Sequence, residues 1–146
     1  MTDPRFEHFD EKMAAEMLRA TTRFGGLPGY LAIRHTEFSA GRLLAEMEAR
    51  DELLTPFGNL HGGCLSAFVD HCLGFVFYPV IPEGAWVATT EFKLNLIKPV
   101  SAGVCQATTQ VLALARRSGV ARIDVVNDDR LVCAAQGTVT IVLPKT

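Results

Sequence analysis

The chain has 146 residues, of which 49% are hydrophobic, and this is enough to bury the core of a single domain. Fourteen basic and sixteen acidic residues give a formal net charge of -2 without a dense basic run, which argues against nucleic-acid binding. The sequence shows no internal repeat, low-complexity segment or interdomain linker. We therefore expect one domain over residues 1–146.

Three further patterns narrow the class of protein. No charged region followed by an apolar stretch and a small-residue cleavage site marks the N-terminus, so we expect a cytoplasmic protein. The four cysteines are widely spread and form no Cys-x-x-Cys pair, which disfavours a metal site and a disulfide framework. The apolar run from about Gly63 to Val80 is interrupted by polar residues, so it predicts a core helix and no membrane span.

The first part of the chain predicts a helix and then two strands. Apolar residues recur at helical spacing from Asp10 onward, and the segment Phe24–Gly29 ends this helix. We expect residues 1–29 to form an N-terminal helix and linker, and residues 30–144 to form the core. From Tyr30 to Phe38 and from Arg42 to Arg50 the pattern indicates a pair of strands.

The stretch from Gly63 to Tyr78 predicts the central element of the fold. Its residues are apolar on nearly every side, which is typical of a helix that is buried all round, and Pro79 is expected to stop it. Asp70 is the anomaly within this helix, because an ionised carboxylate is rarely buried without a partner or a chemical task. Asp70 is therefore the first candidate for a functional residue.

The pattern in the second half of the chain predicts long strands. Residues from Trp86 to Lys98 alternate, with Thr90, Phe92, Leu94 and Leu96 on one face and Thr89, Glu91, Lys93 and Asn95 on the other. Three further strands are expected over residues 104–115, 120–127 and 131–143, as an antiparallel meander. The predicted class is α+β, with one curved antiparallel sheet of about six strands wrapped around the long buried helix.

The entry to the central helix is the second functional feature. The sequence His61-Gly62-Gly63 predicts a glycine turn that leads into unpaired N–H groups at a helix start, where a carbonyl oxygen that gains negative charge is stabilised. Gly62 and Asp70 are eight positions apart, so they lie roughly 12 Å apart along one helix. Two such helices packed antiparallel across a two-fold axis bring Asp70 of one chain near Gly62 of the other, which predicts a dimer.

These features together resemble hotdog-fold acyl-CoA thioesterases of the PaaI type, the 4-hydroxybenzoyl-CoA thioesterase-like family. The resemblance runs from about Leu31 to Leu143 and rests on four features of the sequence. They are His61-Gly62-Gly63, Asp70 nine positions after His61, the strand Thr89–Asn95, and the Lys98-Pro99 corner. It implies a hotdog fold, hydrolysis of an acyl- or aryl-CoA, no cofactor apart from coenzyme A in the substrate, and a homodimer or dimer of dimers.

The resemblance also implies roles for individual residues. Asp70 activates water or attacks the thioester, and the Gly62 amide of the other subunit polarises its carbonyl. The family often places Asn or Gln about six positions before the histidine, where this chain has Thr55, and Asn59 is a candidate to compensate. The expected substrate-binding residues are His61, Gly63, Thr55, Asn59, Thr89, Lys98, Arg116 and Arg117.

Other interpretations of these residues remain. Asp70 can be a structural carboxylate, and His61 can simply hold its loop by hydrogen bonds. His71 is treated as a core or interface histidine, because neighbours one apart on a helix do not face each other. Ser66 has no Gly-x-Ser-x-Gly surroundings, which argues against a serine hydrolase. Thr55 motivates the alternative function, a non-catalytic protein that binds or senses acyl-CoA.

Overall fold

The N-terminal helix forms where the sequence predicts it. The computed structural model describes residues 8–145, so residues 1–7 and 146 of the expected domain lie outside the described part of the chain. Helix α1 (Glu11–Ala20) begins at Asp10, whose Oδ1 accepts a hydrogen bond of 2.9 Å from the Met13 backbone N–H. A carboxylate in this position satisfies one of the free N–H groups of the first turn.

The segment after α1 is more ordered than the sequence suggests. A single 3-10 turn (Thr21–Arg23) is followed by a short helix, α2 (Gly26–Tyr30), where only a break was expected. Proline is tolerated in the first turn of a helix, so Pro28 does not prevent α2 from forming. The expected strand from Tyr30 is therefore wrong at its start, because the first strand begins only at Arg34.

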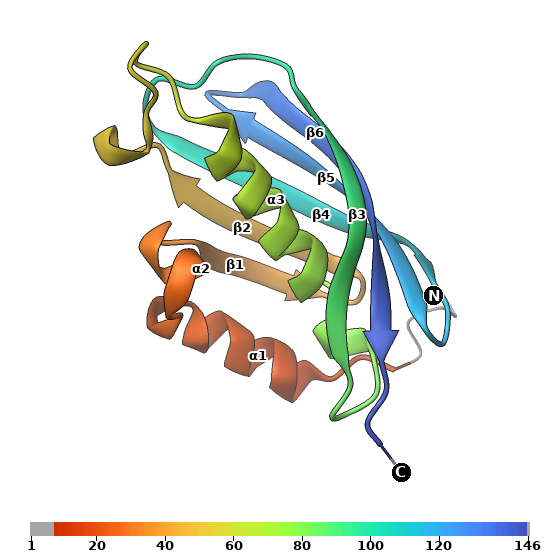
Figure 1. The fold of residues 1–146 in the computed structure, drawn as a ribbon. Coiled ribbons are helices and arrows are strands. Elements are labelled where there is room, and N and C mark those ends of the chain that lie inside the picture. The colour runs from red at the N-terminus through yellow and green to blue at the C-terminus, as the bar shows by residue number, and fades with distance from the viewer. Residues whose placement is uncertain (1–7, 146) are drawn as a thin grey trace.

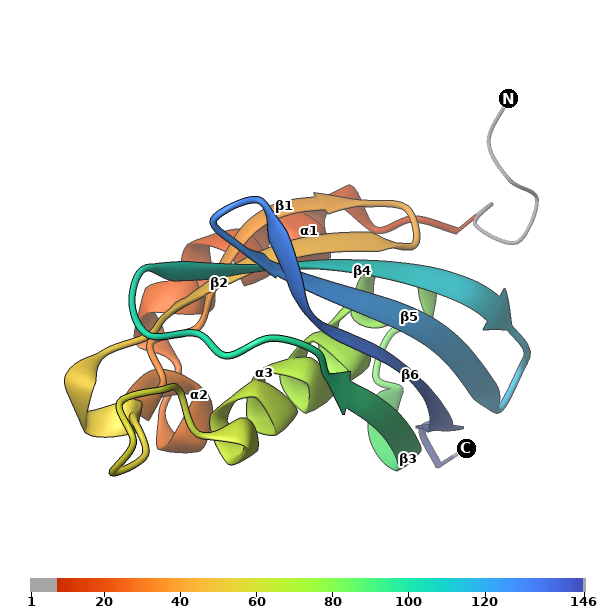
Figure 2. The ribbon, with the colours of Figure 1, turned by 90° about the horizontal axis from the view of Figure 1, so that it is seen from above.

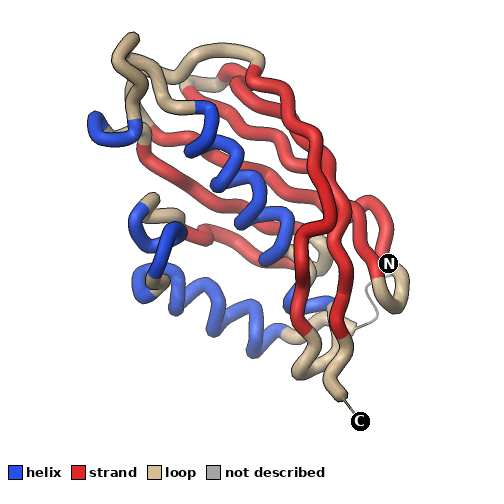
Figure 3. The backbone as a smooth tube through the Cα atoms, viewed as in Figure 1, coloured by secondary structure: helices blue, strands red, loops and turns tan. Residues whose placement is uncertain are grey.

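Six strands form one antiparallel sheet, as predicted (Figure 3). The strands are β1 (Arg34–Ser39), β2 (Arg42–Glu48), β3 (Trp86–Leu96), β4 (Val104–Leu114), β5 (Ser118–Asn127) and β6 (Arg130–Val142). Their spatial order is β1-β2-β4-β5-β6-β3. The meander of β4, β5 and β6 is confirmed, whereas β3 lies at the far edge of the sheet beside β6.

Helix α3 (Gly62–Phe75) lies against the concave face of this sheet (Figures 1 and 2). Phe68, Val69, Cys72 and Leu73 are fully enclosed between α3 and the strands. Burying each large apolar side chain contributes about 1.5 to 3 kcal/mol, so this face fixes the position of the helix. The stretch 62–80 is apolar enough to cross a membrane by composition, but here it is the core helix of the domain.

The prediction of a helix buried all round is wrong for one stripe of α3. Ala67, Asp70, Gly74 and Phe75 are only partly buried in the single chain. The helix also ends at Phe75 rather than at Tyr78, because Pro79 sits in a separate 3-10 turn. Asp70 is thus a half-buried carboxylate on an otherwise apolar stripe.

Strand β3 carries a bulge that changes which side chains face the helix. The pairing with β6 shifts register between Thr89 and Glu91, so strict alternation is interrupted there. Thr89 turns toward α3, whereas the Thr90 hydroxyl lies 3.0 Å from that of Thr140 on the strand beside it. The predicted grouping of Thr89 with Glu91 and Lys93 on one face is therefore wrong.

The two edges of the sheet differ. Helix α1 packs against β1 at one edge (Figure 1), whereas β3 at the other edge pairs only with β6 among the described residues. Strand β3 has 11 residues, and Trp86 near its start and Leu96 at its end are more than half exposed. A long exposed edge strand is a template for pairing with another strand.

Candidate active site

Asp70 and Thr89, two of the candidate site residues, are brought together by a hydrogen bond. The Thr89 hydroxyl donates a hydrogen bond of 2.6 Å to Asp70 Oδ1, so β3 holds a carboxylate presented by α3. The bulge at Thr89 makes this contact possible, because without it the side chain would point to the opposite face of the sheet. The second carboxylate oxygen, Oδ2, has no hydrogen-bond partner among residues 8–145.

Asp70 borders a groove of about 370 Å³ between α2, α3 and β3, which we call the Asp70 groove. Its polar side chains are those of Asp70, His71, Thr89 and Tyr78. The rest of its wall is apolar or glycine, contributed by Leu27, Pro28, Leu31, Ile33, Ala67, Gly74, Phe75 and Val87. An apolar groove with one carboxylate at its side suits an apolar ligand with a single reactive polar centre.

The start of α3 leaves one backbone donor free. His61 precedes the helix, and its Nδ1 accepts a hydrogen bond of 2.8 Å from the Gly63 N–H. The Cys64 N–H donates to the His61 carbonyl. The Gly62 N–H has no hydrogen-bond partner in the described part of the chain. Among the glycines of this turn, Gly62 is therefore the one with an available donor, and the His61 ring caps the helix start.

Gly62 borders a second groove, of about 210 Å³, which we call the Gly62 groove. Asn59 and Lys98 line it with the apolar residues Leu60, Leu65, Leu96, Ile97, Pro99 and Val100. A Cβ atom on Gly62 would lie 2.6 Å from Leu96 Cδ1, so glycine lets the end of β3 lie close over the helix start. The predicted binding residues Asn59 and Lys98 are thus brought together with Gly62, which was predicted to be catalytic.

Other predicted site residues lie outside both grooves. Thr55 donates a hydrogen bond of 3.2 Å to Asn59 Oδ1, and its backbone N–H donates to the Asn59 carbonyl, so it closes a tight turn. Arg116 and Arg117 are exposed in the connection between β4 and β5. Neither arginine lines the Asp70 groove or the Gly62 groove of the same chain.

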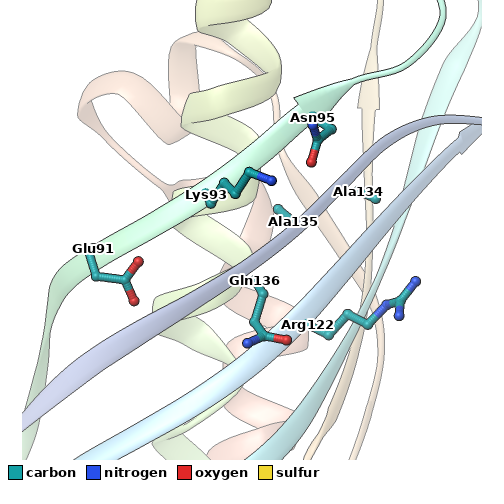
Figure 4. A pocket seen from close by; sticks show the side chains of 7 residues that line it. All are labelled: Glu91, Lys93, Asn95, Arg122, Ala134, Ala135 and Gln136. Atoms are coloured by element: carbon teal, nitrogen blue, oxygen red, sulfur yellow. The ribbon is translucent and has the colours of Figure 1, made fainter.

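A third groove lies on the opposite face of the sheet (Figure 4). It measures about 430 Å³ and is lined by Glu91, Lys93, Asn95, Arg122, Ala134, Ala135 and Gln136. The Arg122 guanidinium pairs with Asp124 at 3.1 Å. None of the predicted site residues lines this groove, so it is separate from the chemistry at α3.

Alternative nucleophiles are unfavourable. The Ser66 hydroxyl donates a hydrogen bond of 2.8 Å to the Gly62 carbonyl, one helical turn back. Burial raises the pKa of Cys72 to about 12 and that of Cys105 to about 11, which keeps both thiols protonated. Ser66, Cys72 and Cys105 are therefore poor candidates for a nucleophile, whereas Asp70 borders the Asp70 groove with one carboxylate oxygen free.

A pair of buried histidines lies beside Asp70, and sequence reasoning did not find it. Nε2 of His35 on β1 is 2.8 Å from Nε2 of His71 on α3. Burial lowers the pKa of His35 to about 4 and that of His71 to about 3, in the second case with a smaller contribution from His35. Both rings are therefore neutral near pH 7. His71 lies within an apolar segment, but His35 is flanked by Arg34 and Thr36, so the sequence carried no clear signal of the pair.

The sequence from residue 57 to residue 134, more than half of the chain, matches the family model of the thioesterase superfamily. The chain belongs to the thioesterase superfamily. A proofreading thioesterase EntH of Cronobacter turicensis is 29% identical over 131 residues, 90% of this chain and 95% of that protein. EntH of Klebsiella pneumoniae is 34% identical over 89 residues, 61% of this chain and 65% of that protein.

Solved structures of this superfamily share the fold. The thioesterase HI1161 of Haemophilus influenzae superposes with a TM-score of 0.84 at 23% identity, over 92% of this chain and 94% of that one. A mutant of the thioesterase PA1618 of Pseudomonas aeruginosa also gives 0.84 at 23% identity, over 93% and 99% of the two chains. The predicted hotdog fold is confirmed, and family membership supports thioester hydrolysis as the activity.

Proposed function

We propose that this thioester hydrolase acts on acyl-CoA substrates at two sites shared by a homodimer. In each site Asp70 of one protomer acts as general base or nucleophile, and the Gly62 N–H of its partner binds the thioester oxygen. The observation that carries this proposal is the placement of Asp70 and Gly62 in two separate grooves of one chain, which have no lining residue in common.

Two features of the surface support a partner chain. The outward stripe of α3 is largely apolar, and Leu27 and Tyr30 on the neighbouring α2 are 56% and 59% exposed. Strand β3, which holds Thr89 and ends beside Gly62, has an open edge. Pairing of two β3 strands about a two-fold axis extends the sheet and covers both features with the same surface of a second copy.

The chemistry follows from the two free groups. The thioester oxygen accepts a hydrogen bond from the Gly62 N–H, which lies at the positive end of the helix and stabilises the negative charge that develops. Asp70 either takes a proton from the attacking water or attacks the carbonyl carbon itself. In the first route the thiolate of coenzyme A leaves and the free acid forms directly. In the second route the thiolate leaves as an acyl–Asp70 anhydride forms, and a water molecule then hydrolyses this anhydride to the free acid and restores the carboxylate.

Charge near the Gly62 groove supports coenzyme A as the leaving group. Lys98 lines this groove, and its ammonium group can contact the phosphates of a nucleotide thioester. Arg116 and Arg117 lie outside both grooves of their own chain, so Lys98 is the stronger candidate for this contact. We place the protein in the cytoplasm, where acyl-CoA thioesters are formed and used.

The decisive experiment mixes two inactive variants. Asp70→Asn removes the carboxylate, and Gly62→Pro removes the N–H at a first helical position, where proline is tolerated. In a mixed dimer one site inherits both lesions and the other inherits neither. Random exchange of equal amounts should therefore restore about one quarter of the wild-type release of coenzyme A per chain.

The matched control mixes Asp70→Asn chains with chains that carry both substitutions. No combination then contains an intact Asp70, so this mixture should stay inactive. Light scattering measures whether each sample is a dimer or the dimer of dimers that the family resemblance implies. If both single variants fold and exchange subunits, yet their mixture releases no coenzyme A, the shared-site proposal is wrong.

A further inference from the structure

The open edge strand β3 carries two unlike charges on the face of the sheet opposite α3. Glu91, Lys93 and Asn95 are exposed there and line the third groove (Figure 4). Arg122, the other charged residue of that groove, is paired with Asp124. Glu91 and Lys93 take part in no ion pair among residues 8–145. Both charges are therefore available to a second chain.

The other face of β3 is apolar. Phe92 and Leu94 pack against the core, yet both are only partly buried in the single chain. A Cβ atom on Gly137 would lie 2.6 Å from Phe92 Cβ and from Leu73 Cδ2, so Phe92 lies on the side of α3. A strand that pairs with this edge therefore meets charges on one face and apolar side chains on the other.

The shared site limits how two β3 strands can pair. In an antiparallel pair of strands, residues directly opposite each other point to the same face of the sheet. Thr89 holds Asp70 at one end of β3, and Leu96 lies over Gly62 at the other end. Asp70 of one chain can meet Gly62 of its partner only if the two-fold axis passes near the middle of this segment.

Charge distinguishes the registers that meet this condition. An axis at Lys93 places two ammonium groups opposite each other, and an axis at Glu91 does the same with two carboxylates. An axis at Phe92 places Glu91 opposite the partner's Lys93 and, by symmetry, forms this pair twice. Unlike charges directly opposite each other stabilise two antiparallel strands, whereas like charges destabilise them. This register also brings the two Phe92 rings together on the apolar face, where an aromatic pair stabilises the contact.

We infer that Glu91 and Lys93 set the register of the dimer and select the partner chain, through two ion pairs between Glu91 of one chain and Lys93 of the other. The inference rests on the proposed function, because it takes the pairing of two β3 strands from it. The registers centred on Phe92 and on Lys93 differ by a slide of two residues, about 7 Å. The ion pairs thus position Asp70 relative to the Gly62 N–H of the partner.

Disulfide cross-linking measures the register. Opposite Cα atoms of antiparallel strands are about 4.5–5.5 Å apart, which a disulfide can span, whereas diagonal neighbours are about 7–8 Å apart and lie beyond its reach. All chains carry Cys64→Ala, because Cys64 is only partly buried and the other cysteines of the described chain are buried. The double variant Glu91→Cys/Lys93→Cys should form a cross-linked dimer on oxidation, and neither single cysteine variant should.

The single variants are the matched controls for the register. Lys93→Cys alone cross-links if the axis lies at Lys93, and Glu91→Cys alone cross-links if it lies at Glu91. Either result overturns the inference, and so does a double variant that forms a dimer in solution but no cross-link.

Reversal of the charges tests the selection of the partner chain. Glu91→Lys and Lys93→Glu each oppose like charges twice in the homodimer, so the dissociation constant should rise by about tenfold. The combined variant Glu91→Lys/Lys93→Glu restores both pairs with the signs exchanged and should bind itself as the wild type does. When the two single variants are mixed, mixed dimers should exceed the fraction of about one half that random pairing gives, and added salt should reduce the excess. Random pairing, or a combined variant as weak as the single ones, contradicts the inference.

These results are separable from the test of the proposed function. If the cross-links follow the predicted pattern but the mixture of Asp70→Asn and Gly62→Pro chains stays inactive, the register stands and the shared site fails. If that mixture regains activity while Lys93→Cys cross-links by itself, the shared site stands and the inferred register is wrong.

Discussion

The Gly62 N–H and the Asp70 carboxylate, both on α3, are held in place in different ways. At the start of the helix the proposed functional group is the backbone N–H of Gly62, which is free because the His61 ring accepts its hydrogen bond from the next N–H. Two turns later the proposed functional group is a side chain, Asp70, which is held by the Thr89 hydroxyl on another element. The first group depends on local geometry, and the second depends on the register of β3.

Under the proposed function, this difference means that a single chain holds only half of each site. Both groups lie on one rigid helix, so their separation of roughly 12 Å cannot close by bending. Each borders its own groove, and the grooves open on different parts of the surface. Variants that remove one of these groups and leave the other intact therefore test the separate roles of Gly62 and Asp70.

Removal of the carboxylate should have the largest effect. Asp70→Asn keeps the size of the side chain and an oxygen that can accept the Thr89 hydrogen bond, but it loses the base or nucleophile. Turnover should fall by roughly two to four orders of magnitude, with binding of acyl-CoA retained. Steady-state kinetics and calorimetric binding measure the two quantities. Unchanged turnover would remove Asp70 from the mechanism.

Removal of the backbone donor should have the next largest effect. Gly62→Pro deletes the N–H, and kcat should fall by roughly two to three orders of magnitude, as expected for one oxyanion donor. The matched variant Gly62→Ala keeps the N–H and adds a Cβ that only the end of the Leu96 side chain must avoid. Its kcat should stay within about tenfold of the wild type. Equal losses in both variants would point to a steric effect.

The start of α3 was predictable from the sequence because its signal is local. The residues His61-Gly62-Gly63 before an apolar segment predict both the helix start and an available N–H. The succession of strands along the chain likewise follows from alternation and turns, although the place of β3 at the edge of the sheet does not. The choice of Gly62 over Gly63 was not derivable from the residues alone. It depends on the His61 ring, which caps the N–H of Gly63.

The surroundings of Asp70 were less predictable because they depend on contacts between distant residues. The bulge that turns Thr89 toward α3 has no marker in the alternating pattern of β3, which placed Thr89 on the opposite face. The exposed stripe of α3 was hidden because its residues are as apolar as those that face the sheet. The contact between His35 and His71 joins residues 36 positions apart, so only the folded topology brings them together.

The histidine pair beside Asp70 should also make the stability of the fold depend on pH. Both histidines take up protons near pH 6.5 when unfolded, whereas burial lowers their pKa values to about 4 and about 3 in the fold. The stability that depends on keeping this pair neutral is therefore fully present above pH 6.5, and it is lost as the pH falls toward 4. The loss from this pair should approach about 2 to 3 kcal/mol per pH unit between about pH 6 and 4.5.

Denaturant unfolding at several pH values measures this slope. The double variant His35→Phe/His71→Phe removes both buried rings and should show a shallower loss of stability with acid than the wild type. The same slope in both proteins would show that the buried pair does not control acid sensitivity.

The smallest expected effect tests the bulge in β3. Thr89→Val removes the hydroxyl that donates to Asp70 Oδ1 but keeps a β-branched side chain suited to a strand. Because a hydrogen bond to a charged group contributes about 1.5 to 3 kcal/mol, a partial loss of carboxylate orientation should lower kcat by about tenfold, with little change in KM.

The control is Thr90→Val, since Thr90 pairs with Thr140 on the other side of the bulge and does not contact Asp70. Its kcat should match the wild type. If the two variants behave alike, the register shift between Thr89 and Glu91 does not position the carboxylate, and Asp70 is held in place by α3 alone.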